Sequence, residues 1–64
     1  MSSPALWTIE HHQEGWEVYM LNRIVTHSLE SQEDALEAIR RRSDLPTVVQ
    51  VVELDGYRHS LRVV

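Results

Sequence analysis

The chain has 64 residues, ten of them acidic and six basic, which gives a formal net charge of −4. A chain of this length is expected to form one small domain over residues 1–64, burying only about 60% of the surface that its unfolded chain exposes. The negative charge argues against direct nucleic-acid binding, which depends on Lys and Arg neutralising phosphates. The absence of cysteine excludes disulfides and thiolate metal sites, and it favours a cytoplasmic location.

Neither a membrane span nor a secretory signal is expected. The chain has no run of about 18 apolar residues, the length that a membrane-spanning helix needs. Its start, MSSPALWTIEHH, lacks the basic stretch followed by an apolar stretch that is typical of a secretory signal. We expect residues 1–4 to be loosely held.

The first third of the chain predicts a β-hairpin. Apolar and polar residues alternate from Ala5 to His12 and again from Trp16 to Leu21. Gln13, Glu14 and Gly15 predict the connecting turn, where glycine supplies a positive φ. The residues that share one side are Trp7, Ile9, His11, Trp16, Val18 and Met20. We expect the two tryptophans to lie in the core and to stack on each other across the hairpin.

The next segment admits two interpretations. Asn22 tolerates a left-handed conformation, so residues 21–23 can form a tight turn into a third strand, Ile24 to Ser28. Alternatively, residues 16–28 form one long strand with a bulge. We prefer the turn.

A helix is predicted to follow. Ser31 suits its N-cap, with Asp34 three residues later in place of the usual Glu or Gln of a capping box. Acidic residues occupy the first turns, and Arg40, Arg41 and Arg42 the last, as the helix dipole prefers. The apolar stripe consists of Ala35, Leu36, Ala38 and Ile39. The segment Asp44–Leu45–Pro46 should end the helix, because the residue before proline avoids helical geometry.

A second hairpin is predicted at the end of the sequence. Asp55 and Gly56 suit a two-residue type I′ turn. In that register Glu53 pairs with Arg58, which is a favourable cross-strand pair. Further pairs are Leu54 with Tyr57, Val52 with His59, and Gln50 with Leu61. The face predicted to pack on the helix comprises Val48, Gln50, Val52, Leu54, Tyr57, His59, Leu61 and Val63. Its opposite face, or a free strand edge, remains available for a partner.

Catalytic, cofactor and metal sites are not expected. His11 and His12 are adjacent in a strand and point to opposite faces, and no carboxylate or thiolate lies at a zinc-like spacing from His27 or His59. No serine lies in a glycine-rich elbow, and both glycines belong to predicted turns, so no phosphate-binding loop can form. We therefore predict that the protein is not an enzyme.

The acidic residues are the strongest indication of a binding surface. One group surrounds the first turn, and the other lies at the start of the helix. The predicted partner-binding residues are Glu10, Glu14, Glu17, Glu30, Glu33, Asp34 and Glu37. If the two groups share a side, they form a negative patch that can engage a basic protein surface, including one that normally holds nucleic acid. The alternative is a solvated face that keeps the protein soluble.

The segments GWEV (15–18), SQEDALEAI (31–39) and VVELDG (51–56) resemble, in this order, small bacterial and phage domains of uncharacterised function. The size, acidity and α/β pattern also resemble small phage proteins that act against host defences, anti-CRISPR proteins among them. This resemblance implies a cytoplasmic inhibitor in a bacterial host cell, which blocks a basic, nucleic-acid-binding surface of a defence protein such as a CRISPR–Cas component without catalysis. It assigns no site residues.

These observations together predict an α+β fold, with an antiparallel sheet of four or five strands in the order β-β-(β)-α-β-β and one helix packed on one face. The expected function is non-enzymatic binding of a protein with a basic surface, as a monomer or weak homodimer without cofactor. The alternative is a structural or assembly protein that associates with itself through an exposed strand edge.

Overall fold

The computed structural model describes residues 6–64, in which five strands and one helix follow one another. The elements are β1 (Trp7–His12), β2 (Gly15–Met20), β3 (Arg23–Leu29), α1 (Gln32–Arg40), β4 (Thr47–Val52) and β5 (Arg58–Val63). The expectations for residues 1–4, and for Ala5 at the start of the first strand, lie outside the described residues.

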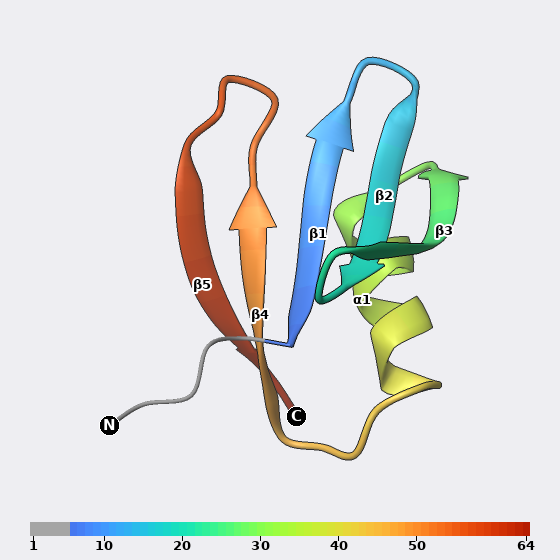
Figure 1. Ribbon diagram of the computed structural model, residues 1–64, viewed down its shortest axis with the longest axis vertical. Coiled ribbons are helices and arrows are strands. Elements are labelled where there is room, and N and C mark those ends of the chain that lie inside the picture. Colours follow the sequence, from blue (N-terminus) through green and yellow to red (C-terminus); the bar gives the residue numbers. More distant parts are fainter. Residues whose placement is uncertain (1–5) are drawn as a thin grey trace.

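The strands form one sheet in the order β3-β2-β1-β4-β5, with α1 on one face (Figure 1). This confirms the α+β fold with five strands and one helix. The expectation of a purely antiparallel sheet is wrong at one pair, because β1 and β4 are parallel. The chain passes from β3 through α1 to the other side of β1, and a crossover of this kind can return the next strand in the same direction.

The core lies between α1 and the covered face of the sheet. Its helix residues are Ala35, Leu36, Ala38 and Ile39, and its strand residues are Trp7, Ile9, Trp16, Val18, Val49, Val51 and Val63. The expected helix stripe and the burial of both tryptophans are therefore confirmed. The expected stacking between the tryptophans is wrong, because Trp7 lies opposite Met20 and Trp16 opposite His11, at different ends of the β1–β2 ladder.

The connection between β2 and β3 confirms the predicted turn and third strand. Residues 21 and 22 form the turn, but the positive φ, 56°, is at Leu21 rather than at Asn22. The turn is held by a hydrogen bond of 2.8 Å from the Leu21 N–H to the Leu6 carbonyl. This contact with Leu6 thus stabilises the positive φ at Leu21, whereas the sequence predicted a left-handed conformation at Asn22.

The helix begins as predicted and ends earlier. The Ser31 hydroxyl accepts a hydrogen bond of 3.1 Å from the Asp34 N–H, which confirms the N-cap. The helix ends at Arg40, and the N–H groups of Arg42 and Ser43 both donate to the Ile39 carbonyl. The expected end at residues 44–46 is therefore too late. The chain leaves the helix in a hydrogen-bonded turn at residues 41 and 42, before it reaches Pro46.

The β4–β5 hairpin forms, but its predicted register is wrong by one residue. Its loop has three residues, Leu54 to Gly56, and the Gly56 N–H donates to the Glu53 carbonyl at 2.9 Å. Gly56 has a φ of 91°. This pattern fits a type I turn followed by a glycine bulge, a common three-residue hairpin connection. The Asp55 carboxylate accepts a hydrogen bond of 3.0 Å from the Tyr57 N–H, which further supports this loop over the two-residue turn.

The changed register alters which residues of β4 face the helix. The observed pairs are Val52 with Arg58, Val51 with His59, Gln50 with Ser60, and Val49 with Leu61. A shift of one residue moves alternate side chains to the other face. Val49 and Val51 are therefore buried, whereas the predicted Val48 is about half exposed. The predicted Glu53–Arg58 pair is absent, and Glu53 instead contacts His59 at 2.8 Å.

Candidate functional site

The two predicted acidic groups lie on opposite faces of the sheet. Glu10 and Glu17 are cross-strand neighbours on β1 and β2, and alternation places them on the open face, away from the buried Ile9 and Val18. Glu33, Asp34 and Glu37 are exposed on α1, which packs on the covered face. The two remaining members, Glu14 and Glu30, are exposed outside the regular elements. One continuous patch does not form from both groups.

On the open face, a histidine lies between two facing carboxylates. His12 Nε2 is 3.2 Å from Glu10 Oε1 and 2.9 Å from Glu17 Oε1. This nitrogen is enclosed and makes no hydrogen bond of good geometry to residues 6–64, although both carboxylates lie close to it. Glu10, Glu17 and His12 thus form one polar cluster on the open face of the sheet.

Tyr19 extends this polar group along β2. Its hydroxyl donates a hydrogen bond of 2.8 Å to Glu17 Oε1. That bond, together with burial and the negative charges of Glu17 and Glu10, raises the pKa of Tyr19 to about 12. Because the ordinary pKa is about 10, the neutral phenol stabilises the fold below pH 10, and this contribution is lost as the pH rises towards 12.

A second acidic surface, the α1 acidic surface, is formed by Glu33, Asp34 and Glu37 on the helix and by Glu30 just before it. Arg40 Nη1 lies 3.0 Å from Glu33 Oε1 and 3.5 Å from Glu37 Oε2, and Arg41 Nε lies 3.7 Å from Glu37 Oε1. Arg41 follows Glu37 by four residues, a spacing at which opposite charges meet on a helix surface. Exposed pairs of this kind contribute about 0–1 kcal/mol each, so Glu33 and Glu37 can exchange them for a partner's basic side chains.

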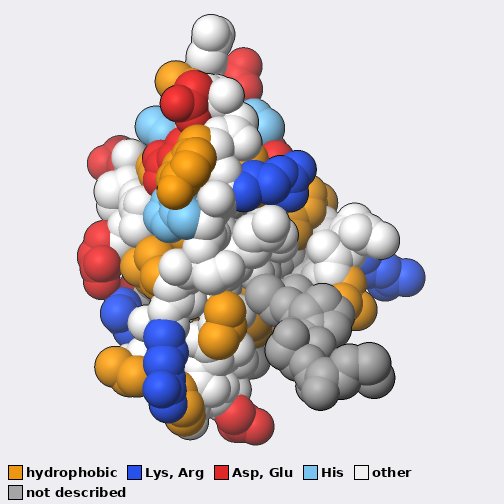
Figure 2. All heavy atoms as spheres, turned by 90° about the vertical axis from the view of Figure 1, so that its left-hand side faces the viewer, with side chains coloured by type: hydrophobic (Ala, Val, Ile, Leu, Met, Phe, Trp, Pro, Cys, Tyr) orange, Lys and Arg blue, Asp and Glu red, His pale blue; other side chains and the backbone are white. Residues whose placement is uncertain are grey.

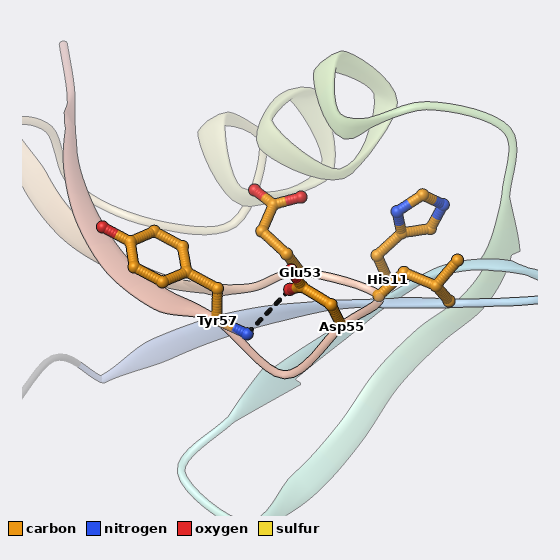
Figure 3. Close-up of a pocket in the computed structure, with 5 residues that line it drawn as sticks. His11, Glu53, Asp55 and Tyr57 are labelled. Carbon is orange, nitrogen blue, oxygen red and sulfur yellow. Dashed lines mark hydrogen bonds between the residues drawn. The ribbon is translucent and has the colours of Figure 1, made fainter.

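A depression lies beside the β4–β5 loop, on the side of the sheet that carries α1 (Figure 3). We call it the hairpin depression; its lining residues are His11, Glu53, Leu54, Asp55 and Tyr57, and its volume is about 380 Å³. Tyr57 and His11 lie at its two ends in Figure 3, with Glu53 and Asp55 between them. Its polar lining therefore consists of carboxylates and rings, without Lys or Arg.

Ring stacking organises both ends of the depression. The rings of His11 and Trp16 are parallel within 7°, with their centroids 4.4 Å apart. The rings of Tyr57 and His59 stack at 5.5 Å, and His59 Nε2 contacts the Glu53 carboxylate. His59 thus contacts both a carboxylate and a ring of the β4–β5 segment. The sequence missed the depression because it assigned Glu53 and Tyr57 to opposite faces; the signal that could have found it is the three-residue alternative for the loop.

The two outer strands differ as sites for a further strand. β3 pairs with β2 through two register shifts and reaches a positive φ of 61° at Ser28. β5 is regular over six residues and, within residues 6–64, has a neighbouring strand on one side only. Figure 2 faces the β5 side and shows basic, acidic, histidine and hydrophobic side chains intermingled there. The free edge of the sheet with regular geometry is therefore β5.

Residues 6–64 contain neither a cluster of metal-binding side chains nor a membrane-spanning helix. No group of three or more His, Asp or Glu side chains in this range is arranged to hold a metal ion. No helix in the same range is long and apolar enough to cross a membrane. As predicted, His11 and His12 point to opposite faces, one stacking on Trp16 and the other contacting Glu10 and Glu17.

Comparison of the whole chain with protein-family models, with curated protein sequences and with solved structures gives no significant match.

Proposed function

We propose that this protein is a non-enzymatic binding module that docks the α1 acidic surface on a basic surface of another protein. The main support for this proposal is that the two faces of α1 differ. The buried residues of α1 all face the sheet, while Glu33, Asp34 and Glu37 are exposed. The splitting of the acidic residues between two faces favours the helix, because Glu10 and Glu17 already surround His12.

More specifically, we propose that the protein acts as an inhibitor in a bacterial cell. The partner is a defence protein of the host, such as a CRISPR–Cas component, and the basic surface is one that normally holds nucleic acid. The acidic net charge, the small size and the likeness in type to phage proteins against host defences support this form. A carboxylate surface can compete there because it presents the same sign of charge as the phosphates.

Reversing the charge at Glu33, Asp34 and Glu37 to Lys is expected to abolish docking. Three exposed pairs, each contributing about 0.7 kcal/mol, correspond to a loss of affinity of about 30-fold, before the added repulsion. The measurement is displacement of labelled nucleic acid from purified CRISPR–Cas effectors, followed by fluorescence anisotropy. The neutral variant E33Q/D34N/E37Q should show an intermediate loss, and circular dichroism should show an intact fold.

The matched control reverses Glu10, Glu14 and Glu17, which changes the net charge equally on the other acidic group. Docking through α1 predicts that this control retains displacement once its fold is verified. An equal loss in both triple variants would indicate non-specific electrostatics, and unchanged displacement by the α1 variant would contradict the proposed surface.

The β5 edge supports a second candidate function, self-association of two copies. The Glu53 N–H donates to the Tyr57 carbonyl at 2.8 Å. Because inward and outward groups alternate along an antiparallel strand, the backbone groups of Arg58, Ser60 and Arg62 point away from β4. These groups have no strand partner within residues 6–64 and can accept another strand, although antiparallel pairing centred on Ser60 brings Arg58 opposite Arg62 of the second copy. That repulsion places this candidate second.

Ser60→Pro is expected to remove any such association without unfolding the protein. Proline eliminates an N–H that points to solvent, so the β4–β5 ladder keeps its bonds. Light scattering at increasing concentration should show wild-type dimers and monomeric S60P. A wild-type protein that stays monomeric at millimolar concentration excludes this candidate.

A further inference from the structure

We propose that the hairpin depression binds an arginine side chain of a partner protein. This site lies outside the α1 acidic surface, and no residue of the depression belongs to the acidic groups described above. The inference therefore goes beyond the proposed function, and either can fail without the other.

The charge of the depression favours a cation. Glu53 and Asp55 line it, and no Lys or Arg does. Glu53 uses Oε2 towards His59, and Asp55 uses Oδ1 towards the Tyr57 N–H. The second oxygen of each carboxylate makes no hydrogen bond to residues 6–64, so both remain available as acceptors.

The rings favour a planar cation. Trp16 covers one face of the His11 imidazole, so a flat group can extend this stack only on the opposite face. Tyr57, 63% exposed, offers a second ring at the other end of the depression (Figure 3). Guanidinium is planar, stacks on aromatic faces and donates in a fork that matches carboxylates, whereas ammonium is a compact, strongly hydrated charge. Arginine therefore fits this lining better than lysine does.

The volume and the apolar lining of the hairpin depression suit one arginine side chain. The volume of about 380 Å³ accommodates a guanidinium with its stem. Leu54, 55% exposed, also lines the depression and supplies apolar surface for the methylene groups that an arginine carries. A bound metal ion is a poorer occupant, because no group of three His, Asp or Glu side chains within residues 6–64 has the arrangement for one.

Glu53 has a second role at this site. Its contact with His59, which itself stacks on Tyr57, connects the central carboxylate to one wall of the depression. A guanidinium bound to Glu53 Oε1 would leave the His59 contact at Oε2 in place. The site is thus partly organised before the ligand arrives, which lowers the ordering cost of binding.

The test uses the full chain and three short peptides, acetyl-Gly-Arg-Gly-amide, its lysine analogue and its citrulline analogue. Citrulline keeps the planar shape without the charge. Binding is followed at low salt by two-dimensional NMR, in which the two tryptophan indole N–H signals report separately. The arginine peptide should shift the Trp16 signal, with a dissociation constant on the order of 1–10 mM. The Trp7 signal should stay in place, because Trp7 lies at the other end of β1.

Two variants locate the binding, and one controls for charge. Glu53→Gln keeps an acceptor for His59 and should weaken binding about fivefold, as the loss of one charge pair implies. Tyr57→Leu should weaken it about two- to fivefold through the lost cation–π contact. Asp44→Asn makes the same change in net charge in the segment between α1 and β4, and it should bind as the wild type does.

Stronger binding of the arginine peptide than of the other two peptides, together with losses in both variants at the depression, supports the proposal. It is overturned if lysine binds as tightly as arginine, if Glu53→Gln and Tyr57→Leu leave affinity unchanged, or if Asp44→Asn weakens binding as much as Glu53→Gln does. The α1 charge-reversal variant should still bind the arginine peptide, which separates this result from the test of the proposed function.

Discussion

Gly15→Ala is expected to destabilise the protein by about 3 kcal/mol or more, because both its backbone and its surroundings require glycine. Gly15 has a φ of 129°, which side chains of L-residues rarely tolerate, and a Cβ there would lie 2.5 Å from the Leu29 carbonyl oxygen. The clash is with backbone, so β3 must move away from β2. A domain of this size has about 3–5 kcal/mol of stability, and the variant should be largely unfolded by circular dichroism.

Gly56→Ala is the matched control for this result. Gly56 also has a positive φ, 91°, but a Cβ there has no other atom within 4 Å. It should cost about 1–2 kcal/mol, the usual cost of a left-handed conformation, as measured by urea unfolding. Equal losses in the two variants would show that the close approach of Leu29 to Gly15 contributes nothing.

Val49→Asp is expected to abolish folding, whereas the same change at the neighbouring Val48 should be tolerated. Val49 is 0% exposed in the core, and an unpaired carboxylate buried there costs several kcal/mol, as much as the whole stability of the domain. Val48 is 48% exposed on the open face, where a carboxylate stays hydrated. Expression level, circular dichroism and tryptophan fluorescence measure the difference.

This pair of variants also tests the register of the β4–β5 hairpin. The two-residue turn predicted from the sequence places Val48 towards the helix and Val49 away from it, so it implies the opposite ranking. A folded V49D together with an unfolded V48D would contradict the observed register.

The elements of the fold were largely predictable, because local signals define them. Alternation marks β1 and β2, and the Ser31 cap fixes the start of α1. The β4–β5 register was not predictable in the same way, since Asp-Gly suits both a two-residue turn and a three-residue loop with a bulge. The choice depends on which valines of β4 reach the core, and that is a long-range property.

The candidate sites were less predictable than the fold. The sequence identified the acidic residues, but their division between two faces follows from where α1 packs on the sheet. The hairpin depression combines residues from β1 and from the β4–β5 segment, which are more than 40 positions apart in the chain. Period-two alternation within each segment does not show that these two segments line the same depression.

The α+β class, the order of the elements, the helix cap and the apolar stripe of α1 could be inferred from the sequence alone. These features depend on interactions between residues a few positions apart, which leave a pattern in the chain. The folded chain was needed to see the parallel β1–β4 pair, the face that each β4 valine occupies and the grouping of Glu53, Asp55 and Tyr57 with His11. These features depend on pairing between distant strands, where a shift of one residue exchanges the two faces.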